Sequence, residues 1–501
     1  MTAALRLAER GCKVSLYEAS DHLGGKASAV ADGTDFDEHG FHIFPAWYYN
    51  VWNLVDDLRI RHHFIERHDF QQLHRGEFPC FKPLHDAAAF RNAWKNLTSG
   101  VLPFHQTLLF FFSTVDLASF KLKEANRLDQ LSITGFLRSR FYRTEKIANV
   151  YQDLMLKAIS VPSHFVSAMT TKKVIQFWAN DPLPMHRILD GNLRERFIDP
   201  FEKQLIDRGV KIYTKHRLAR MELTEQRVVS VRFDHPETGE ALERRPVDRL
   251  VLAIPAEALS KVCDDPVYAA SPTLGNVRNL RSRPMASLNL HFTERIPGIP
   301  PDHINLIDSK YGLTFIDVSQ HWKTNGKFLY DGSVLNVIAT DFSQLEGVTD
   351  DRAKELIVKE LMTFIPTLDS NKIFRSKMQN NLAAPLFMND VGIWHFRPEA
   401  LPERGDDEHR IELTNLYLAG DYCRSHVDLV SMEGAVTTGL KAAEAVRRDV
   451  NELATTPRIF EEPKVHSRVP FLLFYVVGLP FAFAAWLYAW SKGETQIQTR
   501  G

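Results

Sequence analysis

The sequence predicts an α/β protein (α+β overall) in which a discontinuous, Rossmann-like nucleotide-binding domain encloses a second domain of helices and antiparallel strands. Two short apolar strands that end in an acidic residue predict the first domain, at Lys13–Glu18 and Leu416–Asp421, near opposite ends of the chain. The second domain is predicted because residues 265–410 carry strand-like segments at Ala286–Phe292, Leu313–Asp317 and Ser333–Ala339, whereas residues 130–180 have helical spacing. We also expect a hydrophobic helix at the C-terminus.

The early strand, Lys13–Glu18, is followed by a glycine turn. A glutamate at the end of such a strand is how nucleotide-binding folds hold the two ribose hydroxyls of an adenosine, so Glu18 is a candidate for that role. Gly24 and Gly25 let the backbone approach a pyrophosphate closely, and Lys26 adds a positive charge. Taken alone, a Gly-Gly-Lys sequence is more often an ordinary turn.

The late strand breaks at Gly420 and Asp421, and a helix is predicted from Gly434 to Val446. Asp421 stands where a carboxylate can accept hydrogen bonds from sugar or ribityl hydroxyls. The helix offers unpaired backbone N–H groups and the positive end of its dipole to an anionic group. The alternative is an ordinary strand–turn–helix with a solvent-facing aspartate.

Four segments together resemble FAD-dependent proteins of the amine-oxidase fold, most of all phytoene and ζ-carotene desaturases of plants and cyanobacteria and hydroxysqualene dehydroxylases. These segments are Glu18 with Gly24–Lys26, Asp37–Phe44, Ala419–Asp421 and Ser431–Ala435. The resemblance covers nearly all of residues 1–447, and it is more specific for FAD than for any substrate. It implies that the first domain is a FAD-binding domain and that the second binds substrate.

The segment Asp37–Phe44 resembles the part of these enzymes that lies beside the flavin ring. The resemblance implies that Gly40 lets the flavin approach and that His42 faces the substrate cavity. From the residues alone, His39 and His42 are also typical of polar side chains packed against a loop. Neither histidine is assigned acid–base catalysis, and the sequence identifies no catalytic base.

Three further positions follow from the same resemblance. Leu218, which comes after a predicted strand, would meet the adenine through its backbone. Met432 and Glu433 would lie at the isoalloxazine side, where the late helix begins.

The chain departs from the family pattern before its first helix. Related chains open with a strand and a Gly-x-Gly-x-x-Gly turn around the pyrophosphate, and Met1 falls about where the residue after the third glycine would stand. We expect the natural reading frame to begin upstream of Met1. Without that strand and turn, we expect the chain to hold flavin weakly.

The sequence predicts domains that are discontinuous. The FAD-binding domain is expected at residues 1–60, 186–264 and 411–450, and the substrate domain at 61–185 and 265–410. A linker at 451–468 would lead to a membrane segment at 469–490.

Residues 97–117 are mainly apolar and aromatic, but Pro103 prevents a single continuous helix. The segment is too broken to span a membrane. It fits either a pair of buried core helices or a patch that dips into one leaflet and guides a lipophilic substrate inward.

The tail Val469–Trp490 contains no charged residue and is long enough, at about 1.5 Å per residue, to cross a hydrocarbon core of about 30 Å. Trp486, Tyr488 and Trp490 suit an interfacial aromatic belt. More basic residues precede the tail than follow it, so a single C-terminal anchor with a cytoplasmic catalytic body is expected. A hairpin in one leaflet and a hydrophobic dimer contact are the alternatives.

Composition excludes several other classes of protein. The chain has 61 Lys+Arg and 62 Asp+Glu residues, so no broad positive field attracts nucleic acid. Its 4 cysteines are far apart, fit no metal-binding spacing and are typical of free thiols in a reducing compartment. No metal site is predicted.

The expected function is therefore that of a FAD-dependent oxidoreductase, a desaturase or dehydrogenase, acting at the membrane on a long apolar isoprenoid such as a carotenoid precursor or a squalene-related substrate. A membrane quinone would reoxidise the flavin. One alternative is a flavin amine oxidase acting on a polar amine. The other is a flavin-free membrane scaffold that remains from such an enzyme.

Overall fold

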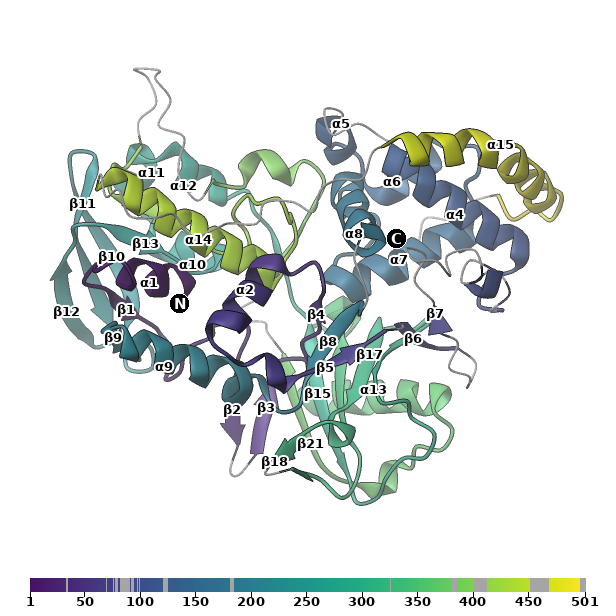
Figure 1. Ribbon diagram of the computed structural model, residues 1–501, viewed down its shortest axis with the longest axis horizontal. Coiled ribbons are helices and arrows are strands. Elements are labelled where there is room, and N and C mark those ends of the chain that lie inside the picture. Colours follow the sequence, from purple (N-terminus) through teal and green to yellow (C-terminus); the bar gives the residue numbers. More distant parts are fainter. Residues whose placement is uncertain are drawn as a thin grey trace.

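The computed structural model contains three groups of elements: a layer of parallel strands, a large antiparallel sheet and a group of helices (Figure 1). The described residues are 1–501 except 33–34, 69, 75, 77–79, 82–90, 92–93, 97, 99, 120–124, 181–183, 325, 381–384, 400–411, 451–467 and 496–501. The predicted linker at 451–468 lies almost wholly outside the described residues.

Two pairs of parallel strands join segments that are far apart in the sequence. Strand β1 (Ser15–Tyr17) pairs with β9 (Lys211–Tyr213), and β13 (Leu250–Leu252) pairs with β23 (Leu416–Leu418). Among the described residues the two pairs form separate two-stranded sheets. The predicted discontinuity of this layer is confirmed, since each pair combines a strand near one end of the chain with a strand from residues 211–252.

Helices from the two ends of the chain also lie together. Helix α1 (Thr2–Ala8) packs against α14 (Met432–Asp449), and the two lie side by side in Figure 1. They approach closely because position 439 is glycine: a Cβ at Gly439 would lie 3.0 Å from the Cβ of Thr2. Their apolar seam includes Ala3, Leu7, Tyr417, Ala442, Ala443 and Val446.

Residues 217–246 form a three-stranded antiparallel sheet. The helix before it begins as a π-helical turn and continues as an α-helix. The elements of this region are the π turn Arg194–Ile198, α9 (Asp199–Asp207), β10 (Arg217–Thr224), β11 (Arg227–Asp234), β12 (Ala241–Pro246), α10 (Ala256–Val262), α11 (Asp265–Ala270) and α12 (Pro272–Val277).

The antiparallel sheet has seven strands in the order β21-β15-β20-β17-β16-β6-β7. The three predicted strands of residues 286–339 are confirmed, and β15, β17 and β20 are buried along their whole length because the sheet is covered on both faces. Helix α13 (Asp350–Phe364) packs Ala353, Ile357 and Leu361 onto the core of this sheet. The strands are β6 (Phe70–Leu73), β7 (Cys80–Phe81), β15 (Ala286–Phe292), β16 (His303–Leu306), β17 (Leu313–Asp317), β20 (Val334–Ala339) and β21 (Ile373–Asn380).

A small sheet of order β4-β8-β5 lies between the parallel layer and the antiparallel sheet. Its strands are β4 (Phe44–Pro45), β5 (Phe64–Arg67) and β8 (His186–Leu189), and α2 (Tyr49–Asp57) follows β4. The remaining short strands are β2 (Ala29–Asp32), β3 (Asp35–Glu38), β14 (Ser282–Arg283), β18 (Lys323–Thr324), β19 (Lys327–Phe328) and β22 (Leu386–Phe387).

The helical group contains the long apolar segment of residues 97–117. Helix α4 (Phe104–Ser119) begins directly after Pro103, as the position of that proline predicts. Its side chains Leu109, Phe112 and Leu117 are buried, so the core-helix alternative applies to this part of the segment. The other helices of the group are α5 (Ala125–Asp129), α6 (Ile133–Arg138), α7 (Glu145–Ile159), α8 (Ala168–Asn180) and α15 (Arg468–Ser491).

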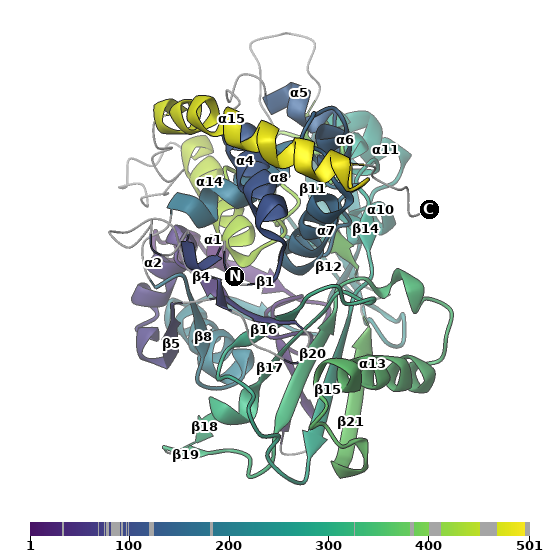
Figure 2. The same cartoon turned by 90° about the vertical axis from the view of Figure 1, so that its right-hand side faces the viewer.

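Helix α15 packs against α4 along much of its length and does not project away from the other helices (Figure 2). Small residues form the contact: Ala482, Ala485 and Ala489 are buried, spaced three and four apart on one side of the helix. Beyond its C-terminus, the carboxylate of Glu494 lies 2.8 Å from Nε2 of His105 and accepts a 2.6 Å hydrogen bond from Gln106.

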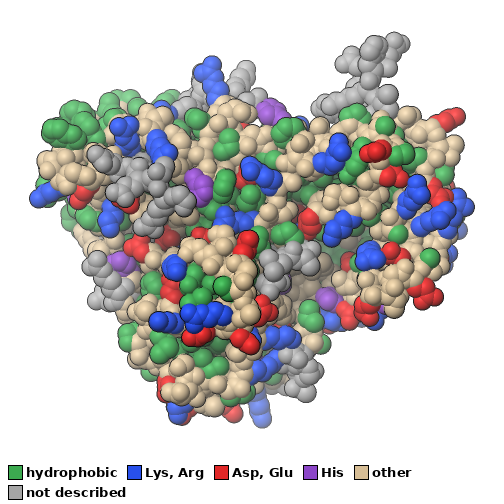
Figure 3. Space-filling view, turned by 180° about the vertical axis from the view of Figure 1, so that it is seen from behind, with side chains coloured by type: hydrophobic (Ala, Val, Ile, Leu, Met, Phe, Trp, Pro, Cys, Tyr) green, Lys and Arg blue, Asp and Glu red, His purple; other side chains and the backbone are tan. Residues whose placement is uncertain are grey.

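The outer side of α15 is apolar and exposed. Its exposed side chains include Leu473, Phe474, Val476, Val477, Phe481, Phe483, Leu487 and Trp490. Apolar side chains gather at the upper left of Figure 3, over this helix. Among the described residues, α15 contains the one stretch, Phe471–Ser491, that is long and apolar enough to cross a membrane.

Candidate functional site

Glu18 is held at the end of β1 by the neighbouring strand. Its backbone N–H donates to the carbonyl of Tyr213, and its own carbonyl accepts from His216, with 2.9 and 2.8 Å between the heavy atoms. One carboxylate oxygen accepts a 2.8 Å hydrogen bond from the backbone of Ser20. Leu218 pairs with Phe233, whose ring stacks on Tyr17, so the structure brings the candidate adenine contact to the same edge as Glu18.

The glycine turn after Glu18 requires glycine at its first position. Gly24 has φ +113°, and a Cβ there would lie 2.9 Å from both the carbonyl oxygen of Ala27 and the Cβ of Ser28. Lys26 already has protein partners: its Nζ donates to the carbonyl of Pro385 at 2.6 Å and lies 2.8 Å from a carboxylate oxygen of Glu257.

At the end of β23, Gly420 and Asp421 meet the segment that carries Lys26. Gly420 has φ +143°, and a Cβ there would lie 2.6 Å from the Tyr422 ring, so other residues are excluded. Burial raises the pKa of the Asp421 carboxyl, while the charges of Lys26 and Arg397 act in the opposite direction. Two segments about 400 residues apart in the sequence therefore face one another, as predicted, although the cofactor-binding roles of Glu18, Gly24, Gly25, Lys26, Leu218, Gly420 and Asp421 remain predictions.

The loop after β23 is wrapped around the fully buried guanidinium of Arg397. This group donates to the backbone carbonyls of Asp421, Tyr422 and Cys423 at 2.9, 2.9 and 2.7 Å. It also forms an ion pair with the buried Asp428. Arg397 was not predicted as a site residue; the signal available in the sequence is an arginine that follows the aromatic run Trp394–Phe396.

Asp428 extends this network to the helical group. Its carboxylate accepts a 3.2 Å hydrogen bond from Thr170 and lies 3.6 Å from the ammonium of Lys173, both on α8. Its carbonyl accepts from the side chain of Asn389 at 2.8 Å. The position of the loop is therefore linked to the helices beside the candidate site.

Glu433, at the start of α14, caps another helix. Its carboxylate accepts hydrogen bonds from the backbone N–H groups of Asn50 and Val51, at 3.0 and 2.9 Å, at the start of α2. The Asn50 side chain adds a third hydrogen bond, at 2.8 Å. Met432 is partly buried against the main core. The cofactor roles of Met432 and Glu433 remain predictions.

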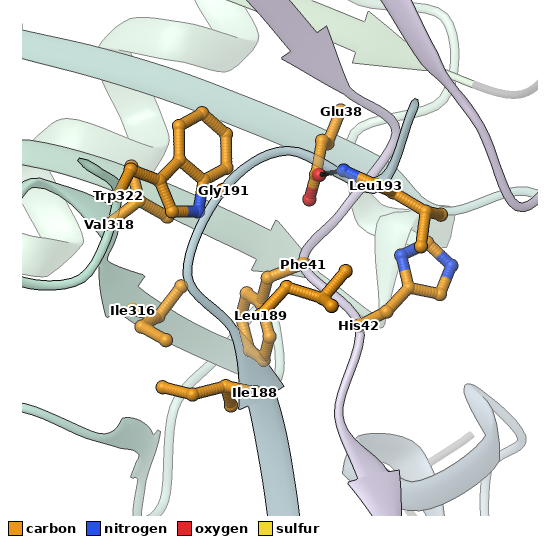
Figure 4. Close-up of a pocket in the computed structure, with 10 residues that line it drawn as sticks. All are labelled: Glu38, Phe41, His42, Ile188, Leu189, Gly191, Leu193, Ile316, Val318 and Trp322. Atoms are coloured by element: carbon orange, nitrogen blue, oxygen red, sulfur yellow. Dashed lines mark hydrogen bonds between the residues drawn. The ribbon is translucent and has the colours of Figure 1, made fainter. Parts of the chain in front are cut away.

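The segment with Gly40 and His42 forms one wall of a small cavity (Figure 4). The other walls come from β8, from the start of the helix after it and from β17. Most of the lining is apolar: Phe41, Ile188, Leu189, Leu193, Ile316, Val318 and Trp322, with Gly191 between β8 and the helix. Glu38 and His42 supply the titratable groups of the lining.

His42 is neutral at physiological pH, because burial lowers its pKa to about 4. Its Nδ1 atom is buried and has no hydrogen-bond partner among the described residues. Gly40 has φ +135°, and a Cβ there would lie 3.0 Å from the Ile338 side chain, so the close approach of this turn to β20 requires glycine.

A group of three buried side chains lies behind the cavity wall. The imidazole Nε2 of His186 lies 3.2 Å from the Asp302 carboxylate, and the ring of His303 lies 5.2 Å from that of His186. Burial lowers the pKa of His303 to about 3 and keeps it neutral. The guanidinium charge of Arg67 acts on Asp302, so this carboxylate already has a positive partner, and its contact with His186 links β8 to the segment before β16.

These residues fit a bound FAD in two respects. A carboxylate stands at the end of β1 for ribose hydroxyls, and Nδ1 of His42 is buried without a hydrogen-bond partner among the described residues. A dinucleotide with hydroxyl, carbonyl and ring nitrogen atoms would supply such partners.

A family model described as flavin containing amine oxidoreductase matches residues 1–447. The chain belongs to this family. It is a flavin-containing oxidoreductase, and FAD is its cofactor, as predicted.

Three similar proteins cover most of the chain. The ζ-carotene desaturase of Synechocystis is 23% identical over 495 residues, which is 91% of this chain and 96% of that protein. The 15-cis-phytoene desaturase of an Oncidium hybrid is 25% identical over 475 residues, which is 91% of this chain and 77% of that protein. The cyclohexylamine oxidase of Brevibacterium oxydans has a similar structure, with a TM-score of 0.64 at 13% identity, over 90% of this chain and 97% of that one.

The role of Glu18 predicts the behaviour of a Glu18→Ala variant. Removing a carboxylate that bonds two ribose hydroxyls should weaken FAD binding about tenfold or more, because hydrogen bonds to charged groups contribute about 1.5–3 kcal/mol. The measurement is the dissociation constant from a flavin fluorescence titration, together with FAD released on denaturation. Glu237→Ala, at an exposed turn, is the control, and equal affinity in all three proteins would exclude the ribose role.

Arg397 offers a test of the loop. An Arg397→Met variant leaves Asp428 charged, buried and without its main partner, so the free energy of unfolding should fall by about 3 kcal/mol or more. Thermal unfolding followed by circular dichroism measures the change, and Arg397→Met with Asp428→Asn should recover part of it. Lys203→Ala, whose side chain is exposed on α9, should unfold like the unchanged protein.

Proposed function

We propose that this chain is a FAD-dependent desaturase or dehydrogenase that acts on a long apolar isoprenoid, such as a carotenoid precursor or a squalene-related substrate. The observation that carries the proposal is the cavity beside the Gly40 segment, whose lining is mainly aliphatic and aromatic. Such a lining suits a hydrocarbon chain and offers an ammonium group few partners. Two of the similar proteins, the ζ-carotene and phytoene desaturases, are named for substrates of this kind.

The chemistry divides between cofactor and protein. Bound FAD supplies a two-electron acceptor for a hydride from a substrate C–H bond. A desaturation also releases a proton from the adjacent carbon as the new double bond forms. The residues of the chain bind and orient the hydrocarbon and exclude water, which is the contribution expected where no titrating triad is needed.

A flavin amine oxidase is the second candidate, because cyclohexylamine oxidase and putrescine oxidase share the fold. An amine substrate would need a charged or aromatic partner for its ammonium group. The cavity lining offers the rings of Phe41 and Trp322 and the carboxyl of Glu38, which would have to be ionised to serve an amine.

The membrane is the proposed location of this activity. The exposed apolar side of α15 supports binding to a lipid surface, because a soluble protein rarely exposes so large an apolar patch without a partner. The docking of α15 along α4 favours an in-plane attachment to one leaflet over a crossing helix. We propose that the body lies on the cytoplasmic side and that a membrane quinone accepts the two electrons.

The FAD-loaded chain provides the test of the reaction. Anaerobic mixing with phytoene, ζ-carotene or hydroxysqualene should bleach the flavin absorbance and give a chromatographic product, and a quinone analogue should restore the yellow colour. Cyclohexylamine is the comparison substrate. Reduction by the amine alone would favour the amine oxidase, and a folded protein that never binds FAD would favour the scaffold.

If the exposed side of α15 binds lipid, acidic substitutions there should weaken membrane binding. Val476 and Phe481 are 66% and 64% exposed, so Val476→Glu with Phe481→Glu should fold normally and bind anionic lipid vesicles at least about tenfold more weakly. Vesicle flotation measures the binding. Phe374→Glu is the matched control, since Phe374 is 66% exposed on the antiparallel sheet. Unchanged flotation of the double variant would exclude α15 as the lipid contact.

A further inference from the structure

Glu38 occupies a special place in the cavity wall. It ends β3, and one carboxyl oxygen accepts a 2.5 Å hydrogen bond from the backbone N–H of Leu193, at the start of the helix after β8. None of the described residues donates a hydrogen bond to the second oxygen. In Figure 4 this oxygen points away from Leu193 toward the interior of the cavity. The carboxyl therefore caps a helix with one atom and leaves the other for a ligand.

The charged groups around Glu38 form ion pairs with one another. The neighbouring Asp37 carboxylate lies 2.9 Å from the ammonium of Lys377 on β21. From the segment after β8, Asp190 and the guanidinium of Arg196 lie 3.0 Å apart.

The histidines nearest to Glu38 carry no charge. His42, in the same wall, and His303, whose ring lies 5.9 Å from that of Phe41, are both neutral because burial lowers the pKa of each. The pKa of His39 is also lowered by burial.

Burial therefore decides the protonation state of Glu38. Removal from water raises the pKa of its carboxyl to about 8, and the hydrogen bond from Leu193 acts only partly against that. At pH 7 the group is mainly a neutral carboxylic acid, and its O–H can donate one hydrogen bond into a cavity lined by apolar side chains and the neutral His42.

We propose that Glu38 donates a hydrogen bond to an oxygen atom of the substrate, so that the cavity selects an isoprenoid carrying a hydroxyl or carbonyl group over the matching hydrocarbon. This inference rests on the proposed function and narrows its substrate class. A hydrocarbon in the same place would leave the O–H of Glu38 without a partner. A site built to bond such an oxygen rejects the analogue that lacks it, here by a factor of about 10 to 100.

An amine would show the opposite dependence on pH. Its ammonium group needs the carboxylate form of Glu38, which grows as pH rises through about 8, whereas a carbonyl oxygen, which can only accept, needs the acid form, which is lost over the same range.

The test uses the full-length chain loaded with FAD in detergent, with a C30 isoprenoid alcohol and its parent hydrocarbon as a matched pair. The ratio of the two kcat/KM values for anaerobic flavin reduction should favour the alcohol by about 10- to 100-fold. Glu38→Gln keeps a donor and an acceptor of the same size and should retain the preference, whereas Glu38→Met should lose it. Glu237→Gln is the control for a surface glutamate.

The pH profile gives a readout that a purely structural role would not change. In the unchanged protein the preference for the matching ketone over the hydrocarbon should decrease as pH rises through about 8, and in Glu38→Gln it should stay constant. Equal use of alcohol and hydrocarbon by the unchanged protein would overturn the inference. So would an amine that is used better as pH rises and is lost in Glu38→Gln.

Equilibrium binding separates this inference from the proposed reaction. Radiolabelled alcohol and hydrocarbon are partitioned between detergent micelles and protein, without turnover. A preference for the alcohol that disappears in Glu38→Met supports the role of Glu38 even if no flavin reduction occurs, in which case the proposed reaction alone is wrong. Equal binding of the two ligands overturns the role of Glu38 whatever the turnover.

Discussion

The candidate site depends on one buried ion pair, that of Arg397 with Asp428. Removing a guanidinium from water costs a large free energy unless its N–H groups form hydrogen bonds. Here the backbone carbonyls of three successive residues and one carboxylate accept those bonds. The loop between β23 and α14 therefore has a fixed shape before any ligand binds. Because Asp428 also bonds to α8, the nucleotide-binding layer and the helical group share one polar centre.

A second constraint is the pairing of distant strands. β1 and β9 belong to segments about 200 residues apart, and β13 and β23 to segments about 170 residues apart. Each pair is short, so side-chain packing must hold the layer together. The small residues of α1 and α14 allow the two helices to pack closely across this layer, and the seam that they form joins the beginning of the chain to its last strand.

Local patterns in the sequence predicted the strand bounds, the helix start and the acidic strand ends, because neighbouring residues determine these features. The strands β15 and β17 have the predicted bounds, because each is a short, mainly apolar run that is buried along its whole length. Pro103 likewise set the start of α4. Glu18 and Asp421 were identified because a strand end gives an acidic residue a defined position.

Contacts between distant residues were not predictable in the same way. Glu433 caps a helix that begins 383 residues earlier, and no spacing in the chain records that partner. Arg397 and Glu38 owe their properties to burial, which depends on the completed fold. The hydropathy of the tail is nearly uniform around the helix, so it did not show which side faces the body, although the spacing of Ala482, Ala485 and Ala489 is a signal for that side.

The way α15 lies on α4 has a practical consequence for work with the protein. Deleting a C-terminal hydrophobic tail is a common route to a soluble enzyme. Here the tail also covers part of the core of the helical group: Phe112 of α4 stacks on Tyr475, and Phe141 contacts Phe483 and Trp486. Removing α15 would expose the apolar side chains of α4 and Phe141 that it now covers, so the shortened chain would still have an apolar surface. Detergent or nanodiscs therefore suit this protein better than truncation.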